Sequence, residues 1–379
     1  MKILIAPDSF KGSLTALEVA ENITKGVLSV LPEAEITKVP MADGGEGTVQ
    51  SLVDATGGKI ISKEVTGPLG EPVKAYFGLL GDGKTGVIEM ATASGLPLVP
   101  PGKADPTKTT TYGTGELIKA ALDEGAQELI IGIGGSATND GGVGMAQALG
   151  ISFKDKDGKE VGFGGGELNR IESIDMSGLD SRINEVEIRV ACDVNNPLYG
   201  PDGAAYIYGP QKGATPEMVR QLDNNLRHFA RIVKRELGKD IQSIPGAGAA
   251  GGLGAGLVAF LNAELRSGVE IVLETNKFAE KLQGVDLVIT GEGKIDGQTV
   301  KGKTPIGVAR KAKEHGIPVI AFAGTLGNDA DIVLKEGIDA IFSIIQQPVA
   351  LEESIQKTAE WLQFSTEQVF RTFKLGSDN

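Results

Sequence analysis

Cysteine and histidine are nearly absent from this chain of 379 residues. It has one cysteine, Cys192, and two histidines, His228 and His315. A single cysteine cannot form an internal disulfide, which fits a reducing compartment. Neither histidine has a cysteine or histidine neighbour at metal-ligand spacing. The sequence therefore disfavours a zinc enzyme and a Ser-His-Asp hydrolase.

The chain also lacks long apolar runs and an excess of positive charge. No apolar stretch approaches the length of a membrane-spanning helix, and the run at residues 3–6 is too short for the core of a signal peptide. We therefore expect a cytoplasmic protein with no membrane partner. The net charge of −13 argues against nucleic acid as a partner. An acidic protein that binds an anion needs local lysines, backbone N–H groups or a metal ion.

Glycine is the residue in excess. The sequence contains 54 glycines, about twice the usual share of roughly 7%. They cluster in short loops between apolar runs rather than in a low-complexity tract. This distribution indicates tight turns and close backbone approaches.

Strands and helices are predicted to alternate at both ends of the chain. This order favours a parallel sheet covered by helices. Near the N-terminus we expect strands at 2–6, 35–39 and 59–65, with helices at 15–31 and 48–55. Near the C-terminus we expect strands at 285–290, 317–322 and 340–345, with helices at 305–314, 329–335 and 351–373. The middle has short strands, glycine-rich loops and helices near 115–124 and 216–237.

These patterns predict an α/β protein of two domains. Residues 1–66 plus 285–379 would form a discontinuous, Rossmann-like doubly wound parallel-sheet domain. Residues 67–284 would form an inserted α/β domain, with the active site in the cleft between the two. The rival prediction is two sequential domains split near residue 150.

Ligands of open α/β sheets bind beyond the carboxyl ends of the strands. After the first strand, Lys11 could hold a phosphate or a carboxylate and Ser9 could hydrogen-bond it, although this segment could also be a plain surface loop. After the second strand, residues 42–48 (ADGGEGT) open a helix, whose N–H groups attract anions. Asp43 suits Mg²⁺ or a substrate hydroxyl, or it could belong to an ordinary acidic helix start.

Three further segments carry candidate residues. Asp193 follows a strand and could accept a proton from a hydroxyl nucleophile, or could simply start a turn. Glu292 and Asp296 could hold Mg²⁺, one of them could act as a base, or both could be solvated loop charges. Residues 245–256 contain six glycines among alanines. Their bare backbone suits a loop around phosphates, or a tightly packed helix start. Lys212 lies in another turn.

Two stretches match general motifs but lack the expected context. Gly132, Gly134 and Ala137 fit the dinucleotide fingerprint, with Asp155 at the distance where its acidic residue is expected. Five turn-forming residues, however, precede the next helix. Residues 297–304 match GxxxxGK[ST], but we expect the preceding strand to end near residue 290. We therefore predict neither a nicotinamide site nor a standard P-loop, although an anion could bind at this helix start.

Seven motifs occur in one order along nearly the whole chain and together resemble the bacterial glycerate kinases of type 1. Each motif is weak alone, and the ordered set is very specific. The motifs lie at residues 8–12, 42–48, 132–142, 192–198, 209–214, 245–254 and 290–303.

The resemblance implies ATP-dependent phosphorylation of D-glycerate with Mg²⁺, giving 2-phosphoglycerate, in a site between two domains. On this hypothesis Asp193 accepts the proton of the attacking hydroxyl, and Lys11 with Ser9 holds glycerate or the transferring phosphate. Asp43 contacts substrate or metal. The other predicted metal ligands are Asp296 and Glu292, and the predicted phosphate contacts are Gly44, Gly45, Gly248, Gly251, Gly252 and Lys212.

Two other functions stay open at this point. One is a nicotinamide-dependent hydroxy-acid dehydrogenase that uses the Gly132 loop. The other is a non-catalytic protein that binds a small acid. We expect a monomer or a homodimer in each case.

Overall fold

A computed structural model describes residues 1–377 of the chain. The chain forms two compact units, and each is described by itself. The first unit contains residues 1–43, 50–57 and 269–379, and the second contains residues 44–49 and 58–268. Over the described residues, no helix has the length and apolar character needed to cross a membrane.

The first unit is built on a parallel sheet of five strands in the order β13-β12-β11-β1-β2. This is the 2-1-3-4-5 order of a doubly wound fold, and its switch point lies between β1 and β11. The α/β fold class and the parallel sheet were predicted correctly. The strands are β1 (Lys2–Ile5), β2 (Glu35–Lys38), β11 (Leu287–Ile295), β12 (Val319–Leu326) and β13 (Ala340–Ser343).

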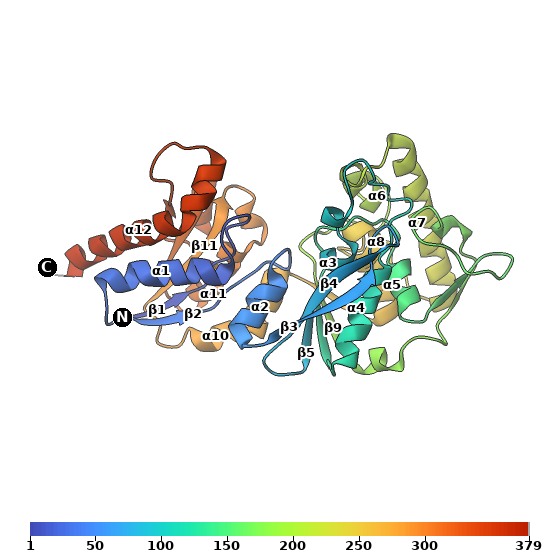
Figure 1. The fold of residues 1–379 in the computed structure, drawn as a ribbon, viewed down its shortest axis with the longest axis horizontal. Coiled ribbons are helices and arrows are strands. Elements are labelled where there is room, and N and C mark those ends of the chain that lie inside the picture. The colour runs from blue at the N-terminus through green and yellow to red at the C-terminus, as the bar shows by residue number, and fades with distance from the viewer. Residues whose placement is uncertain (378–379) are drawn as a thin grey trace. The chain divides into compact units, whose positions relative to one another are not determined.

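Helices cover this sheet, and an apolar core fills the space between the layers. Helix α1 begins with a complete capping box, in which Thr15 and Glu18 bond each other's backbone. It packs along α12, the long C-terminal helix (Figure 1). Trp361, the only tryptophan, lies in this core. The helices are α1 (Ala16–Val30), α2 (Thr48–Thr56), α9 (Gly268–Thr275), α10 (Phe278–Lys281), α11 (Thr304–Glu314) and α12 (Leu351–Ser377), with a 3₁₀ segment at Ala330–Glu336.

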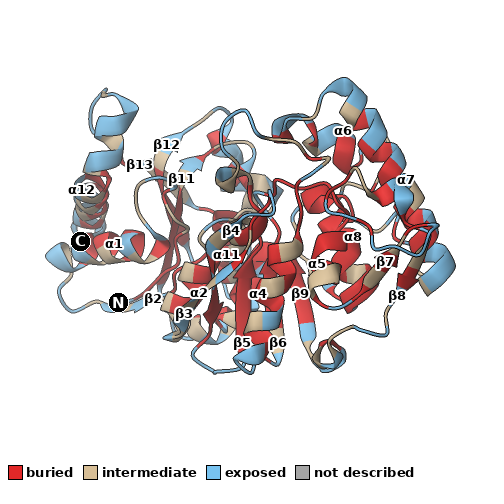
Figure 2. Ribbon diagram, turned by 45° about the vertical axis from the view of Figure 1, so that its right-hand side comes forward, coloured by how far each residue is buried: buried red, intermediate tan, exposed pale blue. Residues whose placement is uncertain are grey.

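The second unit has a mixed sheet of six strands in the order β10-β9-β6-β5-β4-β3. Strands β5, β6, β9 and β10 run parallel, and β3 and β4 add an antiparallel edge. Figure 2 shows much of β5, β6 and β9 as buried. The strands are β3 (Lys59–Thr66), β4 (Pro72–Leu79), β5 (Thr85–Glu89), β6 (Glu128–Gly132), β9 (Glu187–Ala191) and β10 (Glu264–Arg266), with a separate pair β7 (Ser152–Lys154) and β8 (Ser173–Asp175).

The helices of the second unit vary widely in length. The longest, α7, has the predicted range; it starts with Pro216 after a Thr215 cap and ends at Leu237, before Gly238 in the left-handed conformation. The α-helices are α3 (Ala91–Ser94), α4 (Tyr112–Asp123), α5 (Val143–Ala148), α6 (Ala204–Tyr208), α7 (Pro216–Leu237) and α8 (Ala249–Leu261).

The prediction for the third strand was wrong. Residues 59–65 were expected in the terminal parallel sheet, but β3 pairs antiparallel with β4 in the second sheet. The alternation of residues along a strand indicates its faces and does not name its partner. Residues 269–284, which the prediction placed in the inserted domain, belong to the first unit.

Candidate functional site

Asp8 stands at the switch point of the first sheet, directly beyond β1. Its backbone N–H donates to the carbonyl of Gly291 on β11 (2.8 Å), which fixes it between the two strands. One carboxyl oxygen accepts from the N–H of Ser9 (2.6 Å), and the other accepts from the hydroxyl of Thr304 (2.7 Å). Burial, the carboxylate of Asp43 and that of Glu292 together raise the pKa of Asp8 to about 7, and the two hydrogen bonds oppose this. Sequence reasoning missed this residue.

Glu292 lies on β11 at the same edge of the sheet. It is 7% exposed, and it accepts from the hydroxyl of Thr299 (2.5 Å) and from Nζ of Lys303 (3.1 Å). Burial raises the pKa of Glu292, while Thr299 and Lys303 lower it. The switch point therefore brings together carboxyl groups, one lysine and the first turn of α11.

The loop before α11 differs from the prediction. Strand β11 continues to Ile295, pairing with β12 as far as Leu326, so the expected end near residue 290 was wrong. Gly291 interrupts the apolar run because a Cβ atom there would lie 2.3 Å from the carbonyl oxygen of Phe322. The GxxxxGK[ST] string therefore begins two residues after a strand and ends on the first residue of α11, Thr304. Its middle is a 3₁₀ turn (Thr299–Lys301).

Asp296 and the segment after Asp8 complete this side of the first unit. The carboxylate of Asp296 pairs with Nζ of Lys294 (2.9 Å) and accepts from the N–H of Gln298 (2.8 Å), and the Lys294 bond is the main cause of its lowered pKa. A Cβ atom at Gly293 would lie 3.3 Å from the backbone nitrogen of Lys11. The segment after β1 therefore lies beside the end of β11 in space, as expected for loops at the carboxyl ends of parallel strands. The Lys11 side chain is exposed.

The residues at 44–49 belong to the second unit, and there the predicted anion site is already filled. Glu89, the last residue of β5, accepts from the N–H of Val49 (2.8 Å) and also from those of Gly47 and Thr48. A protein carboxylate thus occupies the N-terminus of α2. Phosphate binding by Gly44 and Gly45 stays a prediction.

Close packing explains one glycine of this stretch. A Cβ atom at Gly44 would lie 2.4 Å from the Cβ of Ala191, and one at Gly132 would lie 2.5 Å from the carbonyl oxygen of Gly44. The backbone at Gly44 therefore packs directly against the last residues of β6 and β9. Nearby, the exposed Asp193 accepts from the N–H of Gly268 (3.1 Å).

The glycine-rich segment around α8 packs against protein backbone. A Cβ atom at Gly248 would lie 2.2 Å from the carbonyl oxygen of Pro197, and one at Gly251 would lie 2.0 Å from that of Thr138. Ala250, Gly251 and Gly252 are consecutive left-handed residues, with φ of 51°, 69° and 91°. These contacts show a packing role, and phosphate binding by Gly248, Gly251 and Gly252 stays a prediction.

Lys212 is buried in the second unit, with 1% of its surface exposed. Its ammonium donates to Ser136 Oγ and to the carbonyl of Thr138, both at 2.7 Å. Burial lowers its pKa to about 7, and the nearby carboxylate of Asp140 opposes this shift. In this conformation Lys212 therefore holds the loop after β6. Phosphate binding by it would require this burial to be relieved and stays a prediction.

The same loop contains buried polar groups that the sequence did not single out. Asp140 accepts from the N–H and hydroxyl of Thr111 and from the N–H groups of Gly142 and Gly144. Within the described residues, Thr138 Oγ1 and both amide atoms of Asn139 make no hydrogen bond.

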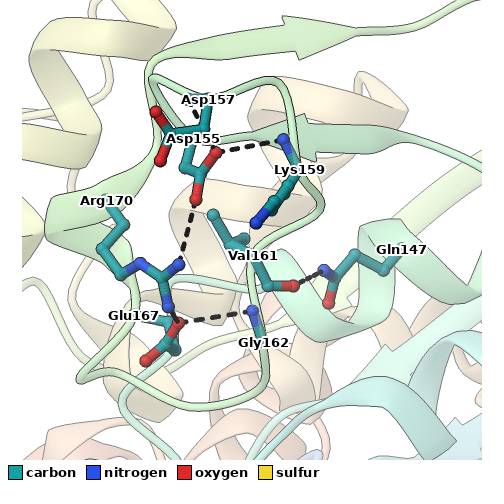
Figure 3. A network of polar contacts seen from close by, with 8 residues as sticks. All are labelled: Gln147, Asp155, Asp157, Lys159, Val161, Gly162, Glu167 and Arg170. Carbon is teal, nitrogen blue, oxygen red and sulfur yellow. Dashed lines mark hydrogen bonds and ion pairs between the residues drawn. The ribbon is translucent and has the colours of Figure 1, made fainter.

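Asp155, the acidic residue of the apparent dinucleotide fingerprint, has a structural role (Figure 3). One carboxyl oxygen accepts from the N–H groups of Asp157 and Lys159 (3.0 Å each), and the other accepts from Arg170 (3.0 Å). Arg170 also binds Glu167. Asp155 thus shapes the turn after β7, which removes the group that would bind a ribose in a dehydrogenase.

Comparisons with known proteins agree with one family. The family model described as the glycerate kinase family matches residues 3–374. A glycerate kinase from Bacillus subtilis (strain 168) is 58% identical over 99% of this chain and 98% of its own. A glycerate 2-kinase from Escherichia coli (strain K12) is 53% identical over the full length of both chains. A crystal structure described as glycerate kinase 2, from Salmonella typhimurium LT2, superimposes with a TM-score of 0.93 at 51% identity and covers both chains completely. The chain therefore belongs to the glycerate kinase family.

Proposed function

We propose that this protein transfers the γ-phosphoryl group of ATP to the C2 hydroxyl of D-glycerate, giving 2-phosphoglycerate and ADP. Phosphoryl transfer to glycerate follows from membership of the family, since a kinase is a phosphotransferase. The choice of C2 rests on the Escherichia coli relative, which is named a glycerate 2-kinase.

One observation carries the proposal for the site. Asp8, Glu292, Lys303 and Thr304 meet at the switch point between β1 and β11, which is where doubly wound sheets bind their ligands. Phosphoryl transfer needs little covalent chemistry from the protein. It needs positioned groups that neutralise the charge on the transferring phosphoryl. The Lys303 ammonium and the first turn of α11 would bind phosphate oxygens, and Lys11 with Ser9 would hold glycerate.

The carboxylates fit a magnesium ion that keeps several water ligands. Asp43 and Glu292 both raise the pKa of Asp8, and Asp43 also raises that of Glu292, so these carboxylates lie near one another. No three such side chains of the described residues form a ready-made metal cage. Mg²⁺ commonly takes one or two carboxylates, water and substrate phosphates. When bound, the ion would neutralise charge on the phosphates, and we propose Asp43 with Glu292 as its carboxylates and Asp296 through water.

For the proton of the attacking hydroxyl we keep Asp193 as the acceptor. It is exposed, so glycerate can reach it, and the Gly268 N–H orients it. Asp193→Asn should lower kcat about 10²- to 10⁴-fold. If Asp193→Asn turns over normally while Asp296→Asn abolishes turnover, the roles of base and metal ligand have been exchanged.

³¹P NMR of the product made from ATP, Mg²⁺ and D-glycerate tests donor and position together. A phosphate on C2 couples to one carbon-bound proton and gives a doublet, whereas a phosphate on C3 couples to two and gives a triplet. A doublet with stoichiometric ADP is expected. A triplet would refute the C2 assignment, and no product with ATP would refute ATP as the donor.

We also propose that the protein is either a monomer or a homodimer. Light scattering in solution would distinguish the two.

A further inference from the structure

Glu89 is a buried carboxylate placed at the N-terminus of a helix. It ends β5, is 6% exposed, and accepts from the N–H groups of Gly47, Thr48 and Val49. These are donors that α2 cannot satisfy internally, and the helix dipole favours a negative charge there. Burial raises the pKa of Glu89, and its hydrogen bonds to these N–H groups oppose the shift. The start of α2 is thus fixed to the end of β5.

The preceding loop is held along its length as well. The N–H of Met41 donates to the carbonyl of Pro7 (3.0 Å). Gly44 has no room for a side chain because Ala191 and Gly268 lie against it. Asp43 is joined covalently to Gly44, so the position of its backbone depends on where residues 44–49 are fixed.

Capping alone does not require a buried carboxylate here. A serine or threonine cap would satisfy donors of a first turn at a lower desolvation cost. A glutamate at the end of β5 does something that a local cap cannot, because it ties residues 47–49 to a strand of their own unit.

We propose that Glu89 is a positioning residue for the kinase reaction, which acts by holding residues 44–49 and thereby Asp43. This inference rests on the proposed function, in which Asp43 contacts substrate or metal. Misplacement of such a group by about 1 Å can cost about 10²-fold in rate.

A double-mutant cycle between Glu89 and Asp43 tests the proposal. Glu89→Gln keeps the size of the side chain but turns an amide toward N–H groups. We expect it to lower kcat about tenfold to a hundredfold with KM for glycerate changed less than threefold. In the Asp43→Asn background the same change should cost less than threefold, because the group that it positions is already gone. Glu64→Gln, an exposed glutamate on β3, is the matched control and should leave kcat unchanged.

The outcomes separate the two proposals. If Asp43→Asn keeps normal turnover, the proposed role of Asp43 fails whatever Glu89 does. If Asp43→Asn is impaired but kcat of the double variant falls by the product of the two single losses, the positioning role is refuted. It is also refuted if Glu89→Gln keeps kcat within twofold of the wild type. If Glu89→Gln does not fold, Glu89→Asp takes its place. The shorter side chain keeps the negative charge but moves the carboxylate away from the N–H groups of residues 47–49. This variant must then show the same loss of kcat and the same dependence on Asp43.

Discussion

Replacement of Asp8 by asparagine is expected to make the protein more stable and less active at alkaline pH. Asparagine keeps the shape of the side chain and both of its contacts. Its oxygen can accept from the N–H of Ser9, and its amide can donate to the hydroxyl of Thr304. What the variant loses is a half-buried negative charge beside Asp43 and Glu292.

The magnitude follows from the pKa of Asp8, which rises from 3.8 to about 7 in the folded protein. Each unit corresponds to about 1.4 kcal/mol, so the ionised carboxylate disfavours the fold by about 4 kcal/mol. Below pH 3.8 the group is protonated in both states and contributes nothing. The penalty grows as the pH rises from about 4 to about 7 and is complete above that. Asp8→Asn should therefore gain about 4 kcal/mol over the wild type at pH 8.5, and much less at pH 5.

The assay is urea unfolding followed by tryptophan fluorescence, without divalent cations. The single tryptophan, Trp361, lies in the core of the first unit, so its emission reports on the unit that contains Asp8. Asp331→Asn, at an exposed position of the same unit, is the control and should show no such dependence on pH. Activity should fall in Asp8→Asn at both pH values, the combination expected where a site is strained for function.

Two results would refute this reasoning. The first is a stability difference of the same size at pH 5 and pH 8.5, which would mean that Asp8 titrates normally. The second is a less stable variant at pH 8.5, which would mean that the hydrogen bonds of the carboxylate outweigh its burial.

Three further predictions concern other parts of the site. Lys303→Met should raise KM for ATP and lower kcat about 10²-fold or more in steady-state assays, because it removes the cation beside Glu292; unchanged kinetics would exclude Lys303 from the site. Lys212→Met removes an ammonium whose pKa is lowered to about 7. In urea titrations the wild type should therefore gain stability relative to this variant as the pH rises from about 7 to 10. If the stability difference between the two proteins does not change with pH, the pKa of Lys212 is not lowered. Gly251→Ala should cost more than about 3 kcal/mol by thermal unfolding, since φ is +69° and the new Cβ would lie 2.0 Å from the Thr138 oxygen; a stable variant would mean that the loop adapts.

The sequence predicted the doubly wound sheet and the longer helices because these depend on local patterns, whereas the expected helix at 329–335 is a 3₁₀ segment. Helix α7 was predicted near residues 216–237 and lies there, because its apolar stripe is a local pattern within one segment of sequence. The partner of β3 could not be predicted in this way, because β3 pairs with a strand that the pattern of the first sixty residues does not include. The end of β11 was misplaced because Gly291 and Gly293 break its apolar run, although the pairing with β12 continues through them.

The candidate site was predicted less well than the fold. The order of strands pointed to Ser9, Lys11 and Glu292, because each follows or ends a strand of the parallel sheet. The contact between Asp8 and Thr304 joins residues 296 positions apart, and no local pattern reports it. Asp8 did carry a signal, as an acidic residue directly after the first strand. The filling of the α2 N-terminus by Glu89 could not be foreseen, because it requires knowing which strand end lies beneath that helix.

The contact between residues 138–142 and 250–256 has a consequence for evolution. Here two stretches of backbone touch with no side chain between them, and the N–H of Gly141 donates to the carbonyl of Gly251. Selection for folding alone would therefore keep glycine at Gly251, Gly252 and Gly256, as strictly as selection for chemistry keeps a reacting group. An alignment of distant family members would therefore show conserved positions at this contact as well as at the switch point. Invariance at these glycines would thus record backbone contact, and the reacting groups are better sought among residues whose side chains would be conserved.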